Sequence, residues 1–225
     1  MVFIVDAVNN GATRNGATRN GPINKRSMGE TMTALTARQR LLDAAVESFA
    51  DKGFTGTTTR DIAARAGMSP AAVYVHHASK EDLLFAVSLA GHKDAIAVIE
   101  QAYSRSDDPV DRIHNMVFDF TKWHAEHSRV GRIVQYEFGA LAPEHRREIA
   151  AIRNAIEDCM RKALEEGIAT KALQIDDIPG TALALLSLGI DVVRWFEPGG
   201  SRNAGDLAKL YAGLAVRMTT SPQSG

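Results

Sequence analysis

The chain has a single cysteine among its 225 residues and no long apolar run. Cys159 alone cannot form a disulfide within the chain or a zinc site built from several cysteines, and a lone thiol fits a reducing cytosol. The best candidate for a membrane span, residues 181–190, is too short to cross a bilayer and is followed by Asp191. Residues 1–5 lack a basic region and a cleavage site, so we expect no secretory signal. The composition therefore predicts a soluble, cytoplasmic protein with no membrane partner.

Neither an excess of one charge nor a catalytic motif is present. The 26 Lys and Arg residues balance 27 Asp and Glu residues, giving a formal net charge of −1; this total does not exclude nucleic-acid binding, which depends on local charge. The glycines of residues 53–59 lack the Lys-Ser/Thr of a P-loop, and no Gly-x-Ser-x-Gly occurs. His124 and His127 have helical spacing, but nothing nearby completes a metal site. We expect no enzyme, no cofactor and no metal.

Strand patterns of convincing length are also missing, and helix signals recur from residue 36 onward. Capping residues precede apolar periodic segments, and glycines follow several of them. The expected starts are at Thr36, Thr58, Ser69, Ser79, Asp108, Arg129, Pro143, Asp177 and Asn203, with stops at Gly53, Gly67 and Gly167. The sequence thus predicts an all-α fold of about nine helices, with a loop over residues 168–176.

The first 35 residues contain little to bury. They include the tandem pentapeptide GATRNGATRN and are rich in Gly, Asn, Thr and Ser, a composition typical of disorder. One interpretation is a disordered tail, or a true start at Met28 or Met32. The other is a basic arm that lies in a DNA minor groove, with Arg14, Arg19, Lys25 and Arg26.

Residues 58–77 have the pattern of a helix-turn-helix. Two short helices are joined by a turn containing Gly67, and the small Ala63 and Ala66 allow the helices to cross closely. The second helix of such a motif enters the major groove, where Tyr74 and His76 would reach phosphate oxygens. By spacing alone, a generic helical hairpin remains the alternative.

The stretch LLDAAVESFADKGFTGTTTRDIAARAGMSPAAVYVHHASKEDLL, residues 41–84, resembles the N-terminal domain of the TetR family of transcriptional regulators. It combines A-x-x-x-F-A-x-x-G-F, T-T-x-R-D-I-A-x-x-A-G-x-S and Y-x-H-x-x-S-K-E-x-L. Val75 and His77 depart from the family pattern; Phe is usual at the position of His77, so we expect slightly looser packing there. The resemblance implies operator contacts from Thr58, Thr59, Arg60, Ser69, Ala71, Tyr74, His76 and Lys80.

The resemblance also implies a division of the chain. Residues 1–35 would be the tail, 36–82 the DNA-binding domain, and 83–220 the ligand-binding and dimerisation domain. In this family the last two helices pair with a second subunit, and the C-terminal helices enclose an effector. The implied dimer contacts are Leu183, Leu186, Ile190, Leu207, Leu210 and Leu214.

The segment DVVRWFEPGG, residues 191–200, resembles TetR members that sense fatty-acyl- or steroid-derived CoA thioesters. Arg194 could pair with a phosphate while Trp195 offers a stacking face; the alternative is a surface arginine beside an interface tryptophan. The expected effector contacts are Phe118, Trp123, Tyr136, Phe138, Met160, Arg194 and Trp195.

Together these features predict a homodimeric, ligand-responsive repressor that binds a palindromic double-stranded DNA operator and is released by a small hydrophobic effector. Two alternatives stay open. One is a TetR-type sensor of a lipophilic, drug-like compound without CoA recognition. The other is an all-α interaction protein with an incidental helix-turn-helix.

Overall fold

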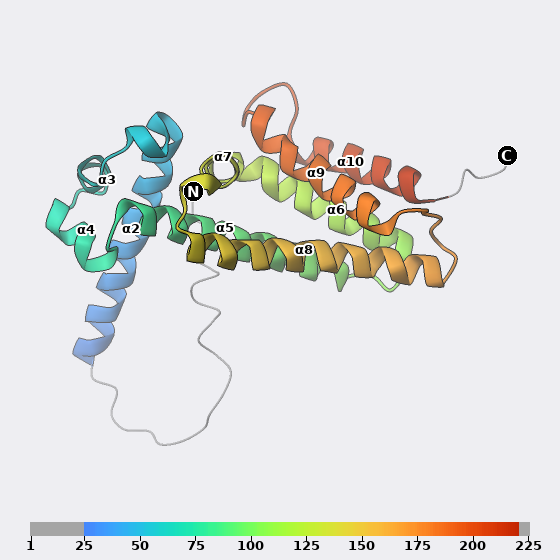
Figure 1. Ribbon diagram of the computed structural model, residues 1–225, viewed down its shortest axis with the longest axis horizontal. Helices are drawn as coiled ribbons and strands as arrows, with labels where there is room; N and C mark the ends of the chain where they lie inside the picture. The colour runs from blue at the N-terminus through green and yellow to red at the C-terminus, as the bar shows by residue number, and fades with distance from the viewer. Residues whose placement is uncertain (1–24, 221–225) are drawn as a thin grey trace, which may run out of the picture. The chain divides into compact units, whose positions relative to one another are not determined.

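The computed structural model describes residues 25–220, and over this range it contains helices and no strand (Figure 1). The all-α prediction of about nine helices is confirmed. The elements are α2 (Lys25–Gly56), α3 (Thr59–Arg65), α4 (Pro70–His76), α5 (Lys80–Tyr103), α6 (Pro109–Glu126), α7 (Ser128–Tyr136), the 3-10 helix η2 (Phe138–Ala140), α8 (Pro143–Ala169), α9 (Ile178–Trp195) and α10 (Ala204–Thr219). Residues 1–24 of the predicted tail lie outside the described residues.

The helix α2 begins at Lys25, earlier than the capping pattern at Thr36 indicates. Residues 25–35 contain no proline and one glycine, so nothing in them ends a helix. They are helical rather than part of a tail. The predicted stop at Gly53 is present, because this residue has a φ of 69° and breaks the helical geometry inside α2.

Most of the other predicted helix starts coincide with the observed ones. Thr58 and Asp61 form a reciprocal capping box at α3, and the Ser69 hydroxyl accepts a hydrogen bond from the Ala72 amide at α4. Asp108 and Asn203 cap α6 and α10 in the same way. These bonds satisfy amides that the first helical turn leaves without a partner.

The end of α8 differs from the predicted stop at Gly167. The helix continues to Ala169, and Lys171 adopts the left-handed conformation with a φ of 62°. A Cβ at Gly167 would come within 2.4 Å of the Leu173 side chain. This glycine is therefore explained by the close approach of Leu173, not by a helix end.

The chain divides into two compact units. The N-terminal unit comprises the described residues up to Gly91 together with Ile133–His145, and the C-terminal unit comprises His92–Arg132 and the described residues from Arg146 onward. The predicted boundary after residue 82 falls near the start of α5, whereas the units divide within this continuous helix.

The core of the C-terminal unit forms where α6 packs along α9 and α10. On α6 the buried positions recur at helical spacing and include Ile113, Met116 and Phe120. They pack in one cluster with side chains of α8 and α9 such as Met160 and Leu185. Apolar burial of this kind supplies most of the stability of a helical domain.

Candidate nucleic-acid interface

Two short helices of the N-terminal unit, α3 and α4, form the helix-turn-helix. The first packs against α2 and the second against α3. Ile62 and Ala63 on α3 and Val73 on α4 are fully buried. Their burial fixes which side of α4 faces outward, since the positions opposite Val73 stay exposed.

The turn between α3 and α4 depends on Gly67 and on an arginine from α2. Gly67 has a φ of 65°, a conformation that glycine adopts without strain. The Arg40 guanidinium donates to the carbonyl oxygens of Ala66 and Gly67. This side chain thus binds the carbonyls at the C-terminal end of α3.

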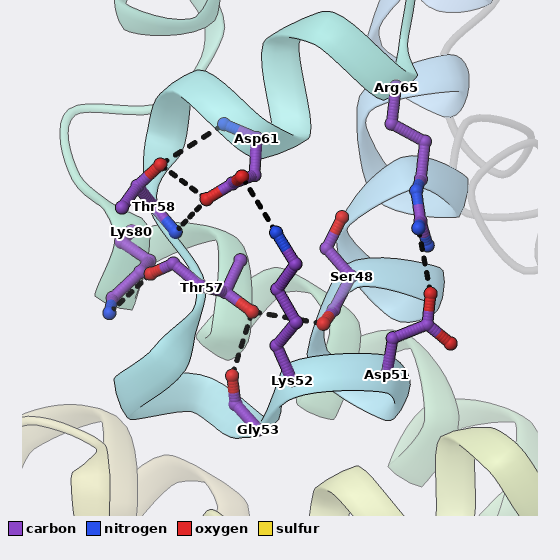
Figure 2. Close-up of polar contacts among 9 residues, drawn as sticks. All are labelled: Ser48, Asp51, Lys52, Gly53, Thr57, Thr58, Asp61, Arg65 and Lys80. Carbon is purple, nitrogen blue, oxygen red and sulfur yellow. Dashed lines mark hydrogen bonds and ion pairs between the residues drawn. The ribbon is translucent and has the colours of Figure 1, made fainter.

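Ion pairs attach α3 to α2 (Figure 2). The Lys52 ammonium lies 2.8 Å from the Asp61 carboxylate, and Arg65 lies 2.7 Å from Asp51. The hydrogen bond from Lys52, followed by those from Thr58, holds the pKa of Asp61 well below its usual range. Asp61 therefore stays ionised and serves both the ion pair and the cap of α3.

The turn between α2 and α3 is held by a second group of polar contacts. The Thr57 hydroxyl lies 2.9 Å from the Ser48 carbonyl and 2.7 Å from that of Gly53 (Figure 2). Lys80 donates to the carbonyls of Phe54 and Thr57 at 2.7 and 2.8 Å, and its ammonium lies 4.2 Å from the centre of the Phe54 ring.

Lys80, predicted to contact a phosphate, thus directs its ammonium at backbone carbonyls. The sequence placed this residue beside the free amides of a helix start, where an anion would bind. Two donors of the ammonium are instead used within the fold, and an ammonium has three. Its first effect is to position the turn that precedes α3.

The outward side of α4 carries the exposed residues Ala71, Tyr74 and Val75. The Tyr74 hydroxyl lies 3.2 Å from that of Thr59, which links this surface to the start of α3. Arg60 is also exposed, on α3. Val75 was not among the predicted contacts, although it follows Ala71 by one helical turn.

The remaining predicted contacts have structural tasks as well. The hydroxyl groups of Thr58 and Ser69 cap α3 and α4. His76 is half-buried and ends α4. The structure therefore brings the predicted residues of α3 and α4 into one short motif, and the exposed ones are Thr58, Arg60, Ser69, Ala71 and Tyr74.

His77, which replaces the usual phenylalanine, is buried at the end of α4. Its Nδ1 lies 3.6 Å from the Asp82 carboxylate, and its buried Nε2 has no hydrogen-bond partner. Burial lowers the pKa of His77, against the opposing effect of Asp82. A neutral imidazole with one unsatisfied nitrogen thus occupies a core position.

The residues predicted to bind an effector are divided between the two units. Met160 is buried in the core of the C-terminal unit, Trp123 packs against that core, and Phe118 is half-buried on α6. Tyr136 and Phe138 belong to the N-terminal unit. The sequence grouped these side chains by type, which does not reveal that the unit boundary runs through α7.

Arg194 and Trp195 lie at the end of α9. Arg194 forms an ion pair with Asp191 at 3.1 Å, one turn earlier on the same helix. Trp195 is exposed and contacts Phe196 edge to face. A phosphate bound here would compete with Asp191 for the guanidinium.

The predicted dimer residues separate into two sets. Leu186 and Leu207 are buried within the chain and belong to the core clusters of the C-terminal unit. Leu183 and Leu210 are 58% and 43% exposed. Ile190 and Leu214 are half-buried.

The helix α9 is long and apolar enough to cross a membrane by length and composition, and 33% of it is buried inside the chain. Core helices of soluble proteins meet the same criterion.

His124 and His127 both direct Nδ1 at a backbone carbonyl four residues earlier, at 2.8 Å. Burial lowers the pKa of His124 to about 4. Within residues 25–220, no group of three His, Cys, Asp or Glu side chains could hold a metal ion.

Two family models match the chain. The model described as "Bacterial regulatory proteins, tetR family" covers residues 41–87, which contain α3 and α4. The model described as "Tetracyclin repressor-like, C-terminal domain" covers residues 106–219. The second match alone spans half of the chain.

Individual proteins agree with these models. The transcriptional repressor KstR2 of Rhodococcus jostii is 27% identical over 190 residues, covering 83% of this chain and 93% of its own. A TetR-family regulatory protein from Rhodococcus RHA1 of known crystal structure is 40% identical, with a TM-score of 0.79 over 83% of this chain and 98% of its own. AibR, crystallised with isovaleryl coenzyme A and operator DNA, is 23% identical with a TM-score of 0.72, over 79% of this chain and 97% of its own, and shows the shared fold.

The two family models, together with the capped helix-turn-helix, define the class of the protein as a DNA-binding regulator. The chain belongs to the TetR family of transcriptional regulators. It is a ligand-responsive regulator and not an enzyme.

Proposed function

We propose that the protein is a cytoplasmic, homodimeric repressor that binds a palindromic operator through α3 and α4 and leaves it when a small hydrophobic effector binds the C-terminal unit. The observation that carries the DNA-binding part is the outward side of α4, where Ala71, Tyr74 and Val75 are exposed on a helix fixed from behind by Val73. In a helix-turn-helix this side enters the major groove.

Dimerisation is supported by the exposed apolar residues of α9 and α10. Leu183 and Trp195 on α9 and Leu210 and Met218 on α10 all expose a large part of their side chains. Large apolar side chains exposed on two helices favour burial against a second subunit. A two-fold dimer would present two copies of α4 to half-sites about 34–36 Å apart.

Selection of duplexes from a random pool tests the DNA-binding part. The expected result is a palindrome with half-sites one helical turn apart, bound with an affinity that falls steeply as salt is raised. A protein with an incidental helix-turn-helix would select no sequence.

For the effector, we propose an acyl-CoA thioester. KstR2 is a named repressor among the relatives, and AibR shows that the fold accommodates both isovaleryl coenzyme A and operator DNA. The side chains buried between α6, α8 and α9 are apolar, as the walls of a site for an acyl or polycyclic group would be. Arg194, beside the exposed Trp195, would pair with a CoA phosphate in place of Asp191.

Matched ligands test this proposal. Dodecanoyl-CoA should raise the melting temperature and release the selected duplex, and dodecanoic acid should do so more weakly. Arg194→Ala should remove most of that difference, while Arg217→Ala, an exposed arginine on α10, should leave it intact. Equal responses to thioester and acid would instead favour a lipophilic effector without CoA recognition.

A further inference from the structure

The exposed side of α4 carries two alkyl side chains, Ala71 and Val75, beside Tyr74. Val75 is 79% exposed, more than any other large apolar side chain among residues 36–220. Ala71, one helical turn before it, is exposed on the same side of the helix. A β-branched residue this exposed buries little apolar surface in the folded chain, so it contributes little to the core and is open to a partner.

The same helix lacks the side chains that read bases by paired hydrogen bonds. From Ser69 to His77 the sequence is SPAAVYVHH, without Arg, Lys, Asn, Gln, Asp or Glu. These six residue types make the bidentate contacts to guanine and adenine or accept from cytosine. The hydroxyl of Ser69 caps the helix, and that of Tyr74 is directed at Thr59.

Major-groove chemistry then leaves one natural partner for the alkyl surface. The apolar group that a base pair presents in this groove is the C5-methyl of thymine. We propose, on the basis of the DNA-binding function proposed above, that Val75 together with Ala71 determines operator specificity by packing against thymine methyl groups. The exposed Arg60 of α3 supplies charge for the phosphates, and such contacts position the protein without specifying sequence.

Replacing thymine by deoxyuridine in the selected operator tests this assignment, because it removes the methyl group and leaves the hydrogen-bonding edge unchanged. One methyl contributes about 0.8 kcal/mol when buried, so one contact in each half-site should weaken binding about 16-fold, or about fourfold per half-site. The slope of affinity against salt should stay the same, since no phosphate contact is lost.

Protein variants locate the contact. Val75→Ala should weaken binding to the thymine duplex and lose most of its preference for thymine over uracil, because only the smaller Ala71 contact remains, and its melting temperature should not change because the side chain is exposed. Tyr74→Phe, which removes the hydroxyl beside Thr59, should keep that preference. Deoxyuridine outside the half-sites should have no effect.

The outcomes separate the two proposals. If the wild type binds its selected duplex equally well with thymine and uracil, or if Val75→Ala discriminates between them as strongly as the wild type does, the methyl assignment is wrong while operator binding stands. If no duplex is selected from the pool, the DNA-binding proposal fails, and this inference fails with it.

Discussion

The backbone N–H of Phe54 donates a hydrogen bond of 3.0 Å to the carboxylate of Glu137, which lies 83 residues later in the chain. The carbonyl oxygen of the same residue accepts from Lys80 at 2.7 Å. The backbone N–H and the backbone C=O of Phe54 are therefore both hydrogen-bonded by side chains that lie outside α2. Next to this contact, Glu81 accepts hydrogen bonds from the amide of Ala142 and from His145. Residues 137–145 thus attach to the end of α2 and to the start of α5 at separate points.

Removing the acceptor should loosen the turn between α2 and α3. Glu137→Ala leaves a half-buried amide without its charged acceptor and should lower the free energy of unfolding by about 1–3 kcal/mol. Glu137→Gln, which keeps an oxygen acceptor, should lose less. Urea unfolding at pH 7 measures both, with Glu148→Ala, an exposed glutamate on α8, as the control. If Glu137→Ala lowered the free energy of unfolding no more than Glu148→Ala does, the contact would not stabilise the turn.

The imidazole of His77 should reduce the stability of the N-terminal unit. Its Nε2 is buried without a partner, and an unsatisfied buried polar group costs about 1–3 kcal/mol. His77→Phe should therefore raise the midpoint of thermal unfolding measured at pH 7. The gain should increase at pH 5.5, because burial lowers the pKa of His77 in the folded state and the unfolded state takes up the proton first. An unchanged or lower midpoint would show that His77 and Asp82 interact favourably enough to offset the burial.

His124 should make the C-terminal unit sensitive to acid. Burial lowers its pKa from 6.5 to about 4, with partial opposition from the hydrogen bond to the Phe120 carbonyl. Between these two values the unfolded state binds more protons than the folded state, so stability is complete above pH 6.5 and falls as the pH decreases. At pH 5 the loss should be about 2 kcal/mol.

The variant His124→Gln isolates this effect, because glutamine keeps a hydrogen-bond donor and does not titrate. The effect of His124 must be separated from that of His145, which has the opposite sign. The hydrogen bond with Glu81 raises the pKa of His145, so its contribution to stability is present at low pH and declines as the pH rises above 6.5. The difference between wild type and variant, measured by urea unfolding from pH 7 to pH 5, contains His124 alone. If the free energy of unfolding changed with pH equally in the wild type and in His124→Gln, the result would contradict the burial of a neutral His124.

The exposed leucines of α9 and α10 should hold the dimer together. Leu183→Asp and Leu210→Asp each place a charge on the exposed apolar surface and should give folded monomers in sedimentation velocity. Leu186→Ala, within the core, should instead lower stability by about 2–5 kcal/mol and leave a dimer. Dimeric Leu183→Asp protein would place the interface elsewhere.

The local signals in the sequence predicted the fold well, because helix caps act between neighbouring residues. Thr58 with Asp61, Ser69 with Pro70, and Asp108 all begin helices where their spacing indicates. The early start of α2 at Lys25 was not predicted, since the absence of helix-ending residues from a segment is weaker evidence for a helix than a capping pattern is.

The site was predicted less completely, because tertiary contacts decide where side chains point. Nothing near Lys80 in the sequence reveals that its ammonium meets the carbonyls of Phe54 and Thr57. Periodicity likewise marks Leu186 and Leu183 as apolar without showing that one faces the core and the other the outside. Val75 carried a signal, since it lies one turn after the predicted contact Ala71, but only its exposure identifies it as a surface residue.

The central claim, that the exposed side of α4 binds operator DNA, is tested most directly by two glutamate substitutions that change the net charge equally. Ala71→Glu places a carboxylate on that side, and Ala155→Glu places one on the exposed surface of α8. Fluorescence anisotropy with the selected duplex should show that Ala71→Glu weakens binding by roughly 100-fold or more, the effect of losing a base contact and adding repulsion of the phosphates. Ala155→Glu should bind like the wild type. Equal dissociation constants for the two variants would contradict the assignment of α4 as the DNA-reading helix.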